Sequence, residues 1–243
     1  MEVSLEPEVE EYPVTMMLSR DGYLKKMTER VLRKATTLKY KDGDEPFIEF
    51  PSSNTHKLLV FTDHRQVYKC KVAQFEDTKS AQLGSYLPTD LGMDPDESVT
   101  WVIDPEDYKA DVLFVFENGR VARVALAGYE TKTNRKRLKN AIYGGSKLLF
   151  ACVLKEDRDL ALVSSDQRLI NFNTSLLKTK TTNSTQGVLV FTAKNGRIVT
   201  MVGTAEEFLG GTASVEKFRA ASLPSSGSPM KETDMKSLFD LEE

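Results

Sequence analysis

Two segments of the chain combine several cations with hydroxyl and amide side chains, a mixture that suits contacts to phosphate groups. One spans residues 20–41, and the other is YETKTNRKRLKN at residues 129–140. Lysine and arginine neutralise phosphate charge, whereas short polar groups fix the position of a nucleic-acid backbone. Aromatic residues that could stack on unpaired bases are largely missing from both segments, which favours duplex DNA as the target. On charge alone, a run such as RKRLK is a solvated strand or loop as often as it is a binding surface.

Residues that could perform catalysis or hold a metal are sparse. His56 and His64 flank an expected strand and have no cysteine pair nearby, which argues against a histidine-rich metal site. The glycine pairs at 144–145 and 210–211 do not open a helix as a phosphate-binding loop would. The carboxylates of residues 90–111 lack the ligand alternation of an EF-hand. We therefore expect no catalytic residue, no metal and no cofactor, and a propeller hydrolase is the least favoured class.

The elements that must position the cations form a loosely repeated phrase. In each phrase a largely apolar run is followed by two or three polar residues and one turn residue. Five turn residues align in this way: Gly22, Arg65, Gly119, Gln167 and Gly196. Asp-Gly or Asn-Gly between apolar runs predicts a hairpin with a type I′ turn, whose two central residues have positive φ. The spacings of 43, 54, 48 and 29 residues are mostly near the ~40 to 50 residues of a propeller blade.

The strand after each turn residue has its own pattern. The positions two and five places beyond the turn residue are apolar in all five phrases, which departs from strict alternation and predicts a bulge or a strong twist. Three of the five phrases have a cation four places beyond it, and these cations are Lys26, Lys69 and Arg123. We expect this recurring cation to face outwards as a phosphate contact.

The remaining pattern is almost entirely that of short strands. Further strands are expected at residues 46–50, 99–104 and 147–154, and helical periodicity is limited to 27–35 and 215–221. We therefore predict an all-β, propeller-like array of about five blades, with six as the alternative number, closed radially so that the hairpin edges are protected. An ordinary sandwich or barrel is the alternative.

The net charge of −3 conceals a segregation of charge along the chain. Residues 1–11 hold five glutamates, whereas residues 12–212 have a net charge of +4. Residues 213–243 are rich in Ser, Pro and Gly and then acidic. We expect an acidic N-terminal extension over 1–11, a β domain over 12–212, and a disordered acidic tail over 213–243. Eight acidic residues between Asp90 and Asp111 polarise the β domain.

The chain shows no signal or transit peptide and no apolar run of about 18 residues, so we expect a cytoplasmic protein with no membrane partner. Its two cysteines, Cys70 and Cys152, lie far apart in expected strands. We expect both to be reduced and buried.

The phrases DGYLKKM, KLLVFTDHRQVYKCKV, TQGVLVFTAKNGRIVTMV and GYETKTNRKRLKN resemble the C-terminal domain of the A subunit of bacterial type IIA topoisomerases, which are DNA gyrase and topoisomerase IV. The resemblance covers roughly residues 12–205. It implies a β-pinwheel, a ring of blades that exchange strands, with duplex DNA bent around a basic rim. It also implies that the chain is no enzyme by itself. Its partners would be the ATPase B subunit of the holoenzyme and the breakage-reunion region of the A subunit, in a nucleoid-associated complex.

Gyrase-type members carry the heptapeptide Gln-Arg-Arg-Gly-Gly-Lys-Gly after the first hairpin. The corresponding stretch here is RVLRKATTLKYKDG, where Arg33 and Lys34 remain as a basic pair and no Gly-Gly follows, which favours the topoisomerase IV type. We expect duplex binding and bending without sequence specificity. The alternative is a propeller that binds other proteins through its acidic 90–111 face and its tail. The expected DNA contacts are Arg20, Lys25, Lys26, Arg33, Lys34, Lys69, Arg123, Lys132, Arg135, Lys136, Arg137 and Lys139.

Overall fold

The structure is a computed structural model that describes residues 10–131, 135–192, 196–210 and 213–235. The described chain divides into two compact units. Unit 1 takes the described residues up to Glu106 together with residues 135–139, and unit 2 takes the other described residues. No helix in the described part is both long and apolar enough to cross a membrane.

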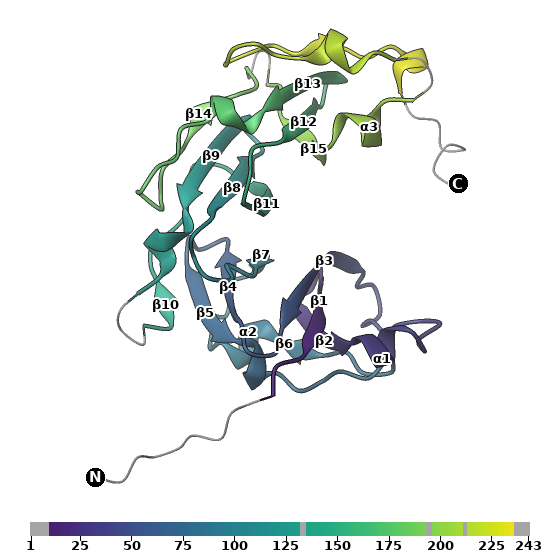
Figure 1. The fold of residues 1–243 in the computed structure, drawn as a ribbon, viewed down its shortest axis with the longest axis vertical. Coiled ribbons are helices and arrows are strands. Elements are labelled where there is room, and N and C mark those ends of the chain that lie inside the picture. The colour runs from purple at the N-terminus through teal and green to yellow at the C-terminus, as the bar shows by residue number, and fades with distance from the viewer. Residues whose placement is uncertain (1–9, 132–134, 193–195, 211–212, 236–243) are drawn as a thin grey trace. The chain divides into compact units, whose positions relative to one another are not determined.

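Unit 1 consists of two four-stranded antiparallel sheets. Its strands are β1 (Pro13–Ser19), β2 (Tyr23–Thr28), β3 (Pro46–Ser53), β4 (Lys57–Thr62), β5 (Val67–Lys71), β6 (Ser85–Tyr86), β7 (Val99–Ile103) and β10 (Arg137–Leu138). Three short helices connect them: α1 (Glu29–Leu32), the 3-10 helix η1 (Val72–Gln74) and α2 (Leu87–Asp90). The strand orders are β3-β1-β2-β6 and β10-β5-β4-β7 (Figure 1).

Unit 2 repeats this plan with two further sheets. Its strands are β8 (Asp111–Phe116), β9 (Arg120–Ala125), β11 (Leu148–Leu154), β12 (Asp159–Ser164), β13 (Arg168–Asn173), β14 (Val188–Leu189), β15 (Val199–Gly203) and β16 (Ser228–Pro229). The helices are α3 (Ala205–Phe208) and the 3-10 helices η2 (Leu126–Tyr129), η3 (Thr174–Leu176), η4 (Val215–Phe218) and η5 (Glu232–Asp234). The strand orders are β11-β8-β9-β14 and β15-β12-β13-β16.

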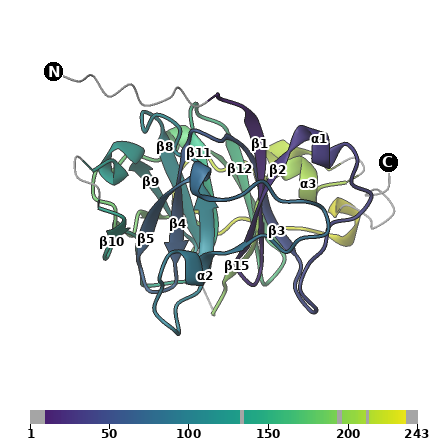
Figure 2. The ribbon, with the colours of Figure 1, turned by 90° about the horizontal axis from the view of Figure 1, so that it is seen from below.

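Every sheet is built around one hairpin, such as β4 and β5, which lie side by side (Figure 2). A third strand flanks the hairpin on one side, and a two-residue strand from later in the chain flanks it on the other. β6, β10 and β14 each follow the next hairpin in sequence and return to the preceding sheet, which is the expected exchange of strands. The all-β prediction is confirmed, with four sheets in the described chain rather than about five.

The fifth phrase accounts for the difference in number. Its apolar run contributes β14, which pairs with β9, and the strand after its turn is β15, which pairs with β12. The two halves therefore belong to different sheets and form no hairpin. An apolar run, a turn and a second apolar run have the same local pattern in a hairpin and in a connection between sheets.

The aligned turn residues have a common backbone conformation. Each has a positive φ, at 92° for Gly22, 60° for Arg65, 80° for Gly119, 57° for Gln167 and 73° for Gly196. In the four hairpins the N–H of this residue donates to the carbonyl three residues earlier. Only one residue per hairpin turn is left-handed, so these are three-residue loops closed by an αL residue and not the predicted type I′ turns.

The second strand of each hairpin is buried on both faces, and this explains its irregular pattern. In β2, the residues from Leu24 to Met27 are all buried, including two lysines. β2 pairs with β1 in a continuous register, so the predicted bulge is absent from it. The register shifts lie instead between the first strand of each hairpin and the strand that flanks it on the outer side.

The structure also differs from the expected disorder of the C-terminal tail. Residues 213–235 form η4, β16 and η5, and β16 pairs with β13 to complete the fourth sheet. Phe218 and Met230 are buried in the core of that sheet with Leu169. Ala213, Val215 and Met235 of the same segment pack against this core as well, so its apolar residues are used although its average composition is polar. Residues 1–9 of the expected acidic extension and residues 236–243 of the expected tail lie outside the described residues.

Both cysteines are free thiols. Cys70 is buried, and burial raises the pKa of its thiol to about 12. Cys152 is only half-buried, and burial raises the pKa of its thiol despite the opposing effect of Arg158.

An ion pair in unit 2 predicts a pH dependence of stability. Arg197 donates from Nε and Nη2 to the two carboxylate oxygens of Asp166 at 2.7 to 3.0 Å. These bonds, together with a hydrogen bond from the Ser164 hydroxyl, hold the pKa of Asp166 below its usual range. The unfolded carboxylate titrates near pH 3.9, so this stabilisation is present above about pH 4 and is lost as the pH falls through the depressed pKa.

Urea unfolding at pH 6 and pH 3 measures this loss. Asp166 is half-exposed, so solvent screening keeps the effect modest. We expect the free energy of unfolding to fall less between the two pH values in Asp166→Asn than in the wild type. An equal fall in both proteins would contradict the assignment.

Candidate nucleic-acid interface

The exchanged strand β10 brings a basic segment onto the edge of β5. Arg137 and Leu138 pair with Tyr68 and Val67, and the N–H of Lys69 donates to the carbonyl of Lys136 at 2.7 Å. On the same sheet, Lys71 of β5 lies directly opposite Lys57 of β4. We call the exposed cations on these three strands and at their ends the β5–β10 strip: Lys57, Lys71, Arg135, Lys136 and Lys139.

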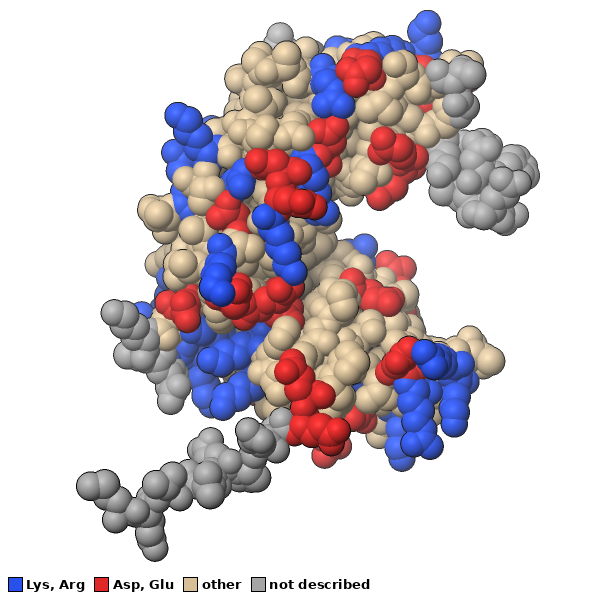
Figure 3. Space-filling view, in the orientation of Figure 1, with Lys and Arg blue, Asp and Glu red and all other residues tan. Residues whose placement is uncertain are grey.

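A second exposed group of cations lies on the segment between β2 and β3. The N–H of Lys39 donates to the carbonyl of Ser80 at 2.9 Å, which places this segment beside the connection from η1 to β6. The α1-loop cluster comprises Arg30, Arg33, Lys34, Lys39 and Lys79, all exposed. Lysine and arginine side chains gather near α1 and near β5 in the space-filling view (Figure 3).

Five of the expected contacts are in exposed positions, with Arg33 and Lys34 in the α1-loop cluster and Arg135, Lys136 and Lys139 in the β5–β10 strip. Arg33 is paired with Glu29 one helical turn earlier, so a phosphate must compete with that carboxylate. Arg20 is exposed but lies 3.7 Å from the ring centroid of Phe47, and its Nε is 3.4 Å from Glu45. Lys69 is half-buried. Lys132 lies outside the described residues.

Lys25 and Lys26 are buried, which corrects the expectation that they face a duplex. The Lys26 ammonium lies 2.9 Å from Asp77 and 3.2 Å from the carbonyl of Phe75. Burial opposes its charge, but hydrogen bonds with Tyr12 and Asp77 raise the pKa of Lys26. Lys25 donates to the carbonyl of Gln82, and burial lowers its pKa. Both lysines hold the connection from η1 to β6 against β2.

Arg123 has the same kind of role in unit 2 and is likewise not presented to solvent as expected. Its Nε lies 2.6 Å from Asp111 and its Nη1 lies 2.7 Å from Asp157. Nη1 also donates to the carbonyl of Thr174 at 3.3 Å. Burial opposes the charge, yet the two carboxylates raise the pKa of Arg123. At Lys26 and Arg123, the recurring cation contacts chain that leaves the following hairpin, at residues 75–77 and at Thr174.

Arg137 is half-buried and engaged by side chains of its own unit. Its Nη2 lies 2.8 Å from Asp94, its Nε donates to Gln66, and its guanidinium is 5.4 Å from the ring centroid of Tyr68. It therefore anchors β10 and is not an exposed contact as expected.

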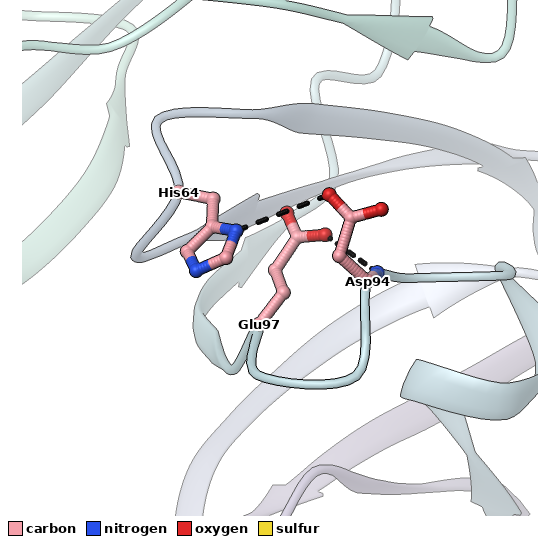
Figure 4. A group of neighbouring side chains, drawn as sticks. All are labelled: His64, Asp94 and Glu97. Carbon is pink, nitrogen blue, oxygen red and sulfur yellow. Dashed lines mark hydrogen bonds and ion pairs between the residues drawn. The ribbon is translucent and has the colours of Figure 1, made fainter.

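Asp94, the partner of Arg137, forms a small cluster with Glu97 and His64 (Figure 4). Ligand atoms of His64, Asp94 and Glu97 lie within 4.8 Å of one another. The buried Glu97 already accepts hydrogen bonds from Thr62, from the Tyr68 hydroxyl at 2.7 Å and from the Asp94 N–H at 3.1 Å. With Asp94 paired to Arg137, the cluster is a hydrogen-bonded support for β10.

Sequence reasoning missed Lys57, Lys71 and Lys79. The first two could have been found from the turn at Arg65, because the hairpin register sets them opposite each other. It also passed over the connection from η3 to β14, where Lys178 and Lys180 are exposed among threonines. This stretch has the same mixture of cations and hydroxyls as residues 129–140.

No protein-family model matches the chain. It is 27% identical over 142 residues to the A subunit of DNA topoisomerase 4 from Bacillus subtilis (strain 168), covering 57% of this chain and 18% of that protein. It is 24% identical over 170 residues to the same subunit from Staphylococcus epidermidis (strain ATCC 12228 / FDA PCI 1200), covering 68% and 21%. The chain thus spans about a fifth of the length of these relatives.

Solved structures show the same fold. The C-terminal domain of DNA topoisomerase IV matches with a TM-score of 0.72 at 19% identity, covering 93% of this chain and 76% of that one. The E. coli ParC C-terminal domain matches with a TM-score of 0.67 at 14% identity, covering 91% and 95%. The DNA gyrase A C-terminal domain gives 0.62 at 15% identity, covering 92% and 80%. The homologues and structural neighbours are therefore those that the repeated phrases resemble, and the fold is the β-pinwheel.

Proposed function

We propose that this chain is a DNA-binding accessory domain of a type IIA topoisomerase, and that unit 1 holds and bends duplex DNA without reading its sequence. The observation that supports this most is the β5–β10 strip. Its five cations come from residues 57–71 and 135–139, and none is in an ion pair with another described residue. Side chains in this state can exchange counterions for phosphates, which is the main source of non-specific affinity.

The arrangement suits contact with a curved backbone. Bending 20 to 30 base pairs by tens of degrees costs on the order of 1 to 6 kcal/mol, so several phosphates must be held at once. The β5–β10 strip and the α1-loop cluster together offer ten exposed cations on unit 1.

The topoisomerase IV type is the variety we favour. α1 takes residues Glu29–Leu32, and Arg33 and Lys34 follow it without a glycine pair. In the holoenzyme the partners of this domain are the breakage-reunion region and the ATPase subunit, which carry the chemistry.

The salt dependence of binding tests this function. We expect the full chain to bind a labelled 30-base-pair duplex with log K falling linearly against log salt, with a slope of about −4.5 if the five strip cations each neutralise one phosphate. A duplex of scrambled sequence serves as the control and should bind equally well. An affinity that does not change with salt concentration contradicts the proposal. It is also contradicted if the chain binds no DNA but still captures protein partners after nuclease treatment.

A further inference from the structure

The exchanged strand β10 is docked differently from the other three exchanged strands. A glycine with positive φ stands immediately before each of the others, at Gly84, Gly187 and Gly227. A Cβ there would lie 2.4, 2.1 and 2.9 Å from a carbonyl oxygen of the neighbouring hairpin strand. The exchanged chain therefore approaches the hairpin backbone closely in these sheets. By the register of the hairpins, Arg137 of β10, opposite Tyr68, stands at the corresponding place, so a long side chain is found where the other exchanged segments have a glycine.

The side-chain clasp of β10 also runs in the opposite direction. In unit 2, Arg120 and Arg168 reach from the second hairpin strand to the exchanged segment, where Arg168 bonds the carbonyls of 226 and 227 at 2.8 Å. Gln66 takes the equivalent position after the turn in unit 1. The arginine is instead on the exchanged strand itself: Arg137 reaches back to Gln66 and Asp94.

Repulsion between like charges opposes the docking of β10 on this sheet. Arg135, Lys136 and Lys139 approach the edge of a sheet that already carries Lys57 and Lys71. Two main-chain residue pairs must hold this segment against the repulsion between cations. The other exchanged strands are Ser85–Tyr86, Val188–Leu189 and Ser228–Pro229, and they bring no charge.

We propose that Arg137 is a positioning residue that latches the basic segment 135–139 onto β5 through a socket of Asp94, Gln66 and Tyr68. The inference rests on the proposed DNA-binding function. Tyr68 and the Asp94 N–H are themselves fixed by the buried Glu97. Bound phosphates remove the repulsion that the latch opposes, so DNA binding and docking of β10 strengthen each other by the same factor.

Asp94→Asn separates this idea from simple electrostatics. Removing a negative charge near the strip would by itself tighten DNA binding. If Asp94 holds the latch, binding weakens about tenfold at 0.1 M salt and the salt slope becomes less negative by about 2, because the cations of 135–139 are no longer held in place. Asp96→Asn is the matched control, since it makes the same charge change on an exposed side chain outside the socket. It should bind as the wild type or more tightly.

Hydrogen exchange of the Lys69 amide reports the latch without DNA, because that N–H donates to Lys136 on the exchanged chain. We expect its protection to fall in Asp94→Asn and in Gln66→Ala, and to rise in the wild type when duplex is added. Arg168→Gln breaks the clasp of β16 and should leave the DNA affinity unchanged while lowering stability. Should the wild type not bind DNA, the proposed function fails, but the DNA-free exchange data still test the latch. Unchanged Lys69 protection in both socket variants would overturn the inference, as would equal DNA binding by Asp94→Asn and Asp96→Asn.

Discussion

Replacing Arg135, Lys136 and Lys139 together by glutamine is expected to weaken duplex binding on the order of 100-fold at 0.1 M salt. Each lost phosphate contact removes the release of about one counterion, so the salt slope should become less negative by about 2 to 3. All three side chains are exposed, and their removal relieves repulsion with Lys57 and Lys71. The stability of the protein should therefore stay the same or increase. Fluorescence anisotropy over a range of salt concentrations measures the affinity and the slope, and urea unfolding measures the stability.

A matched triple variant shows whether position or net charge is responsible. Lys147, Arg158 and Lys231 are exposed cations of unit 2, and their replacement by glutamine changes the net charge by the same amount. We expect this variant to lose only about threefold in affinity, since it removes long-range attraction without removing the strip. Equal losses in the two triple variants would show that the β5–β10 strip is no specific interface.

Arg123→Gln is expected to lower the free energy of unfolding by about 3 kcal/mol, because removing one partner of a buried ion pair leaves the other uncompensated. Asp111 is largely buried and would keep only the hydroxyl of Thr179, at 2.7 Å, as a side-chain partner among the described residues. Urea unfolding measures the loss. The folded variant should bind duplex DNA as tightly as the wild type, since Arg123 is engaged by Asp111 and Asp157 within unit 2.

Arg120→Gln provides the comparison for this prediction. Arg120 is also half-buried in β9, but its side chain makes one long bond, at 3.4 Å, to the carbonyl of Gly187. We expect that variant to lose less than about 1 kcal/mol. If Arg123→Gln weakens DNA binding while its stability is unaffected, the sequence-based assignment of Arg123 as a DNA contact is right and the structural one is wrong.

The hairpins were predictable because the signal that makes them is local. A turn that needs one left-handed residue selects Gly22 or Gly119 within a few positions, and the apolar runs on either side pair by their proximity in the chain. The same register predicts that Lys57 faces Lys71. The resemblance to known relatives rests on these phrases, so the fold could also be inferred before any coordinates.

The exchanged strands could not be predicted in the same way. β6, β10, β14 and β16 have two residues each, which is too short for any periodicity. Each pairs with a hairpin strand that lies far earlier in the chain, so no local pattern specifies the partner. The fifth phrase has the local pattern of a hairpin, but pairing with distant strands places β14 and β15 in two different sheets.

The repeated phrase by itself determined the turns, the strands and the β class, because these depend on interactions within about ten residues. Only the tertiary structure decided which cations are free. Lys26 and Arg123 occupy the same place in the phrase as Lys69, and that place is buried by chain that returns from later in the sequence. Burial demands a partner for a charge, so the carboxylates of Asp77, Asp111 and Asp157 neutralise those cations. The exposed strip depends on the pairing of β10 with β5, which no local pattern specifies.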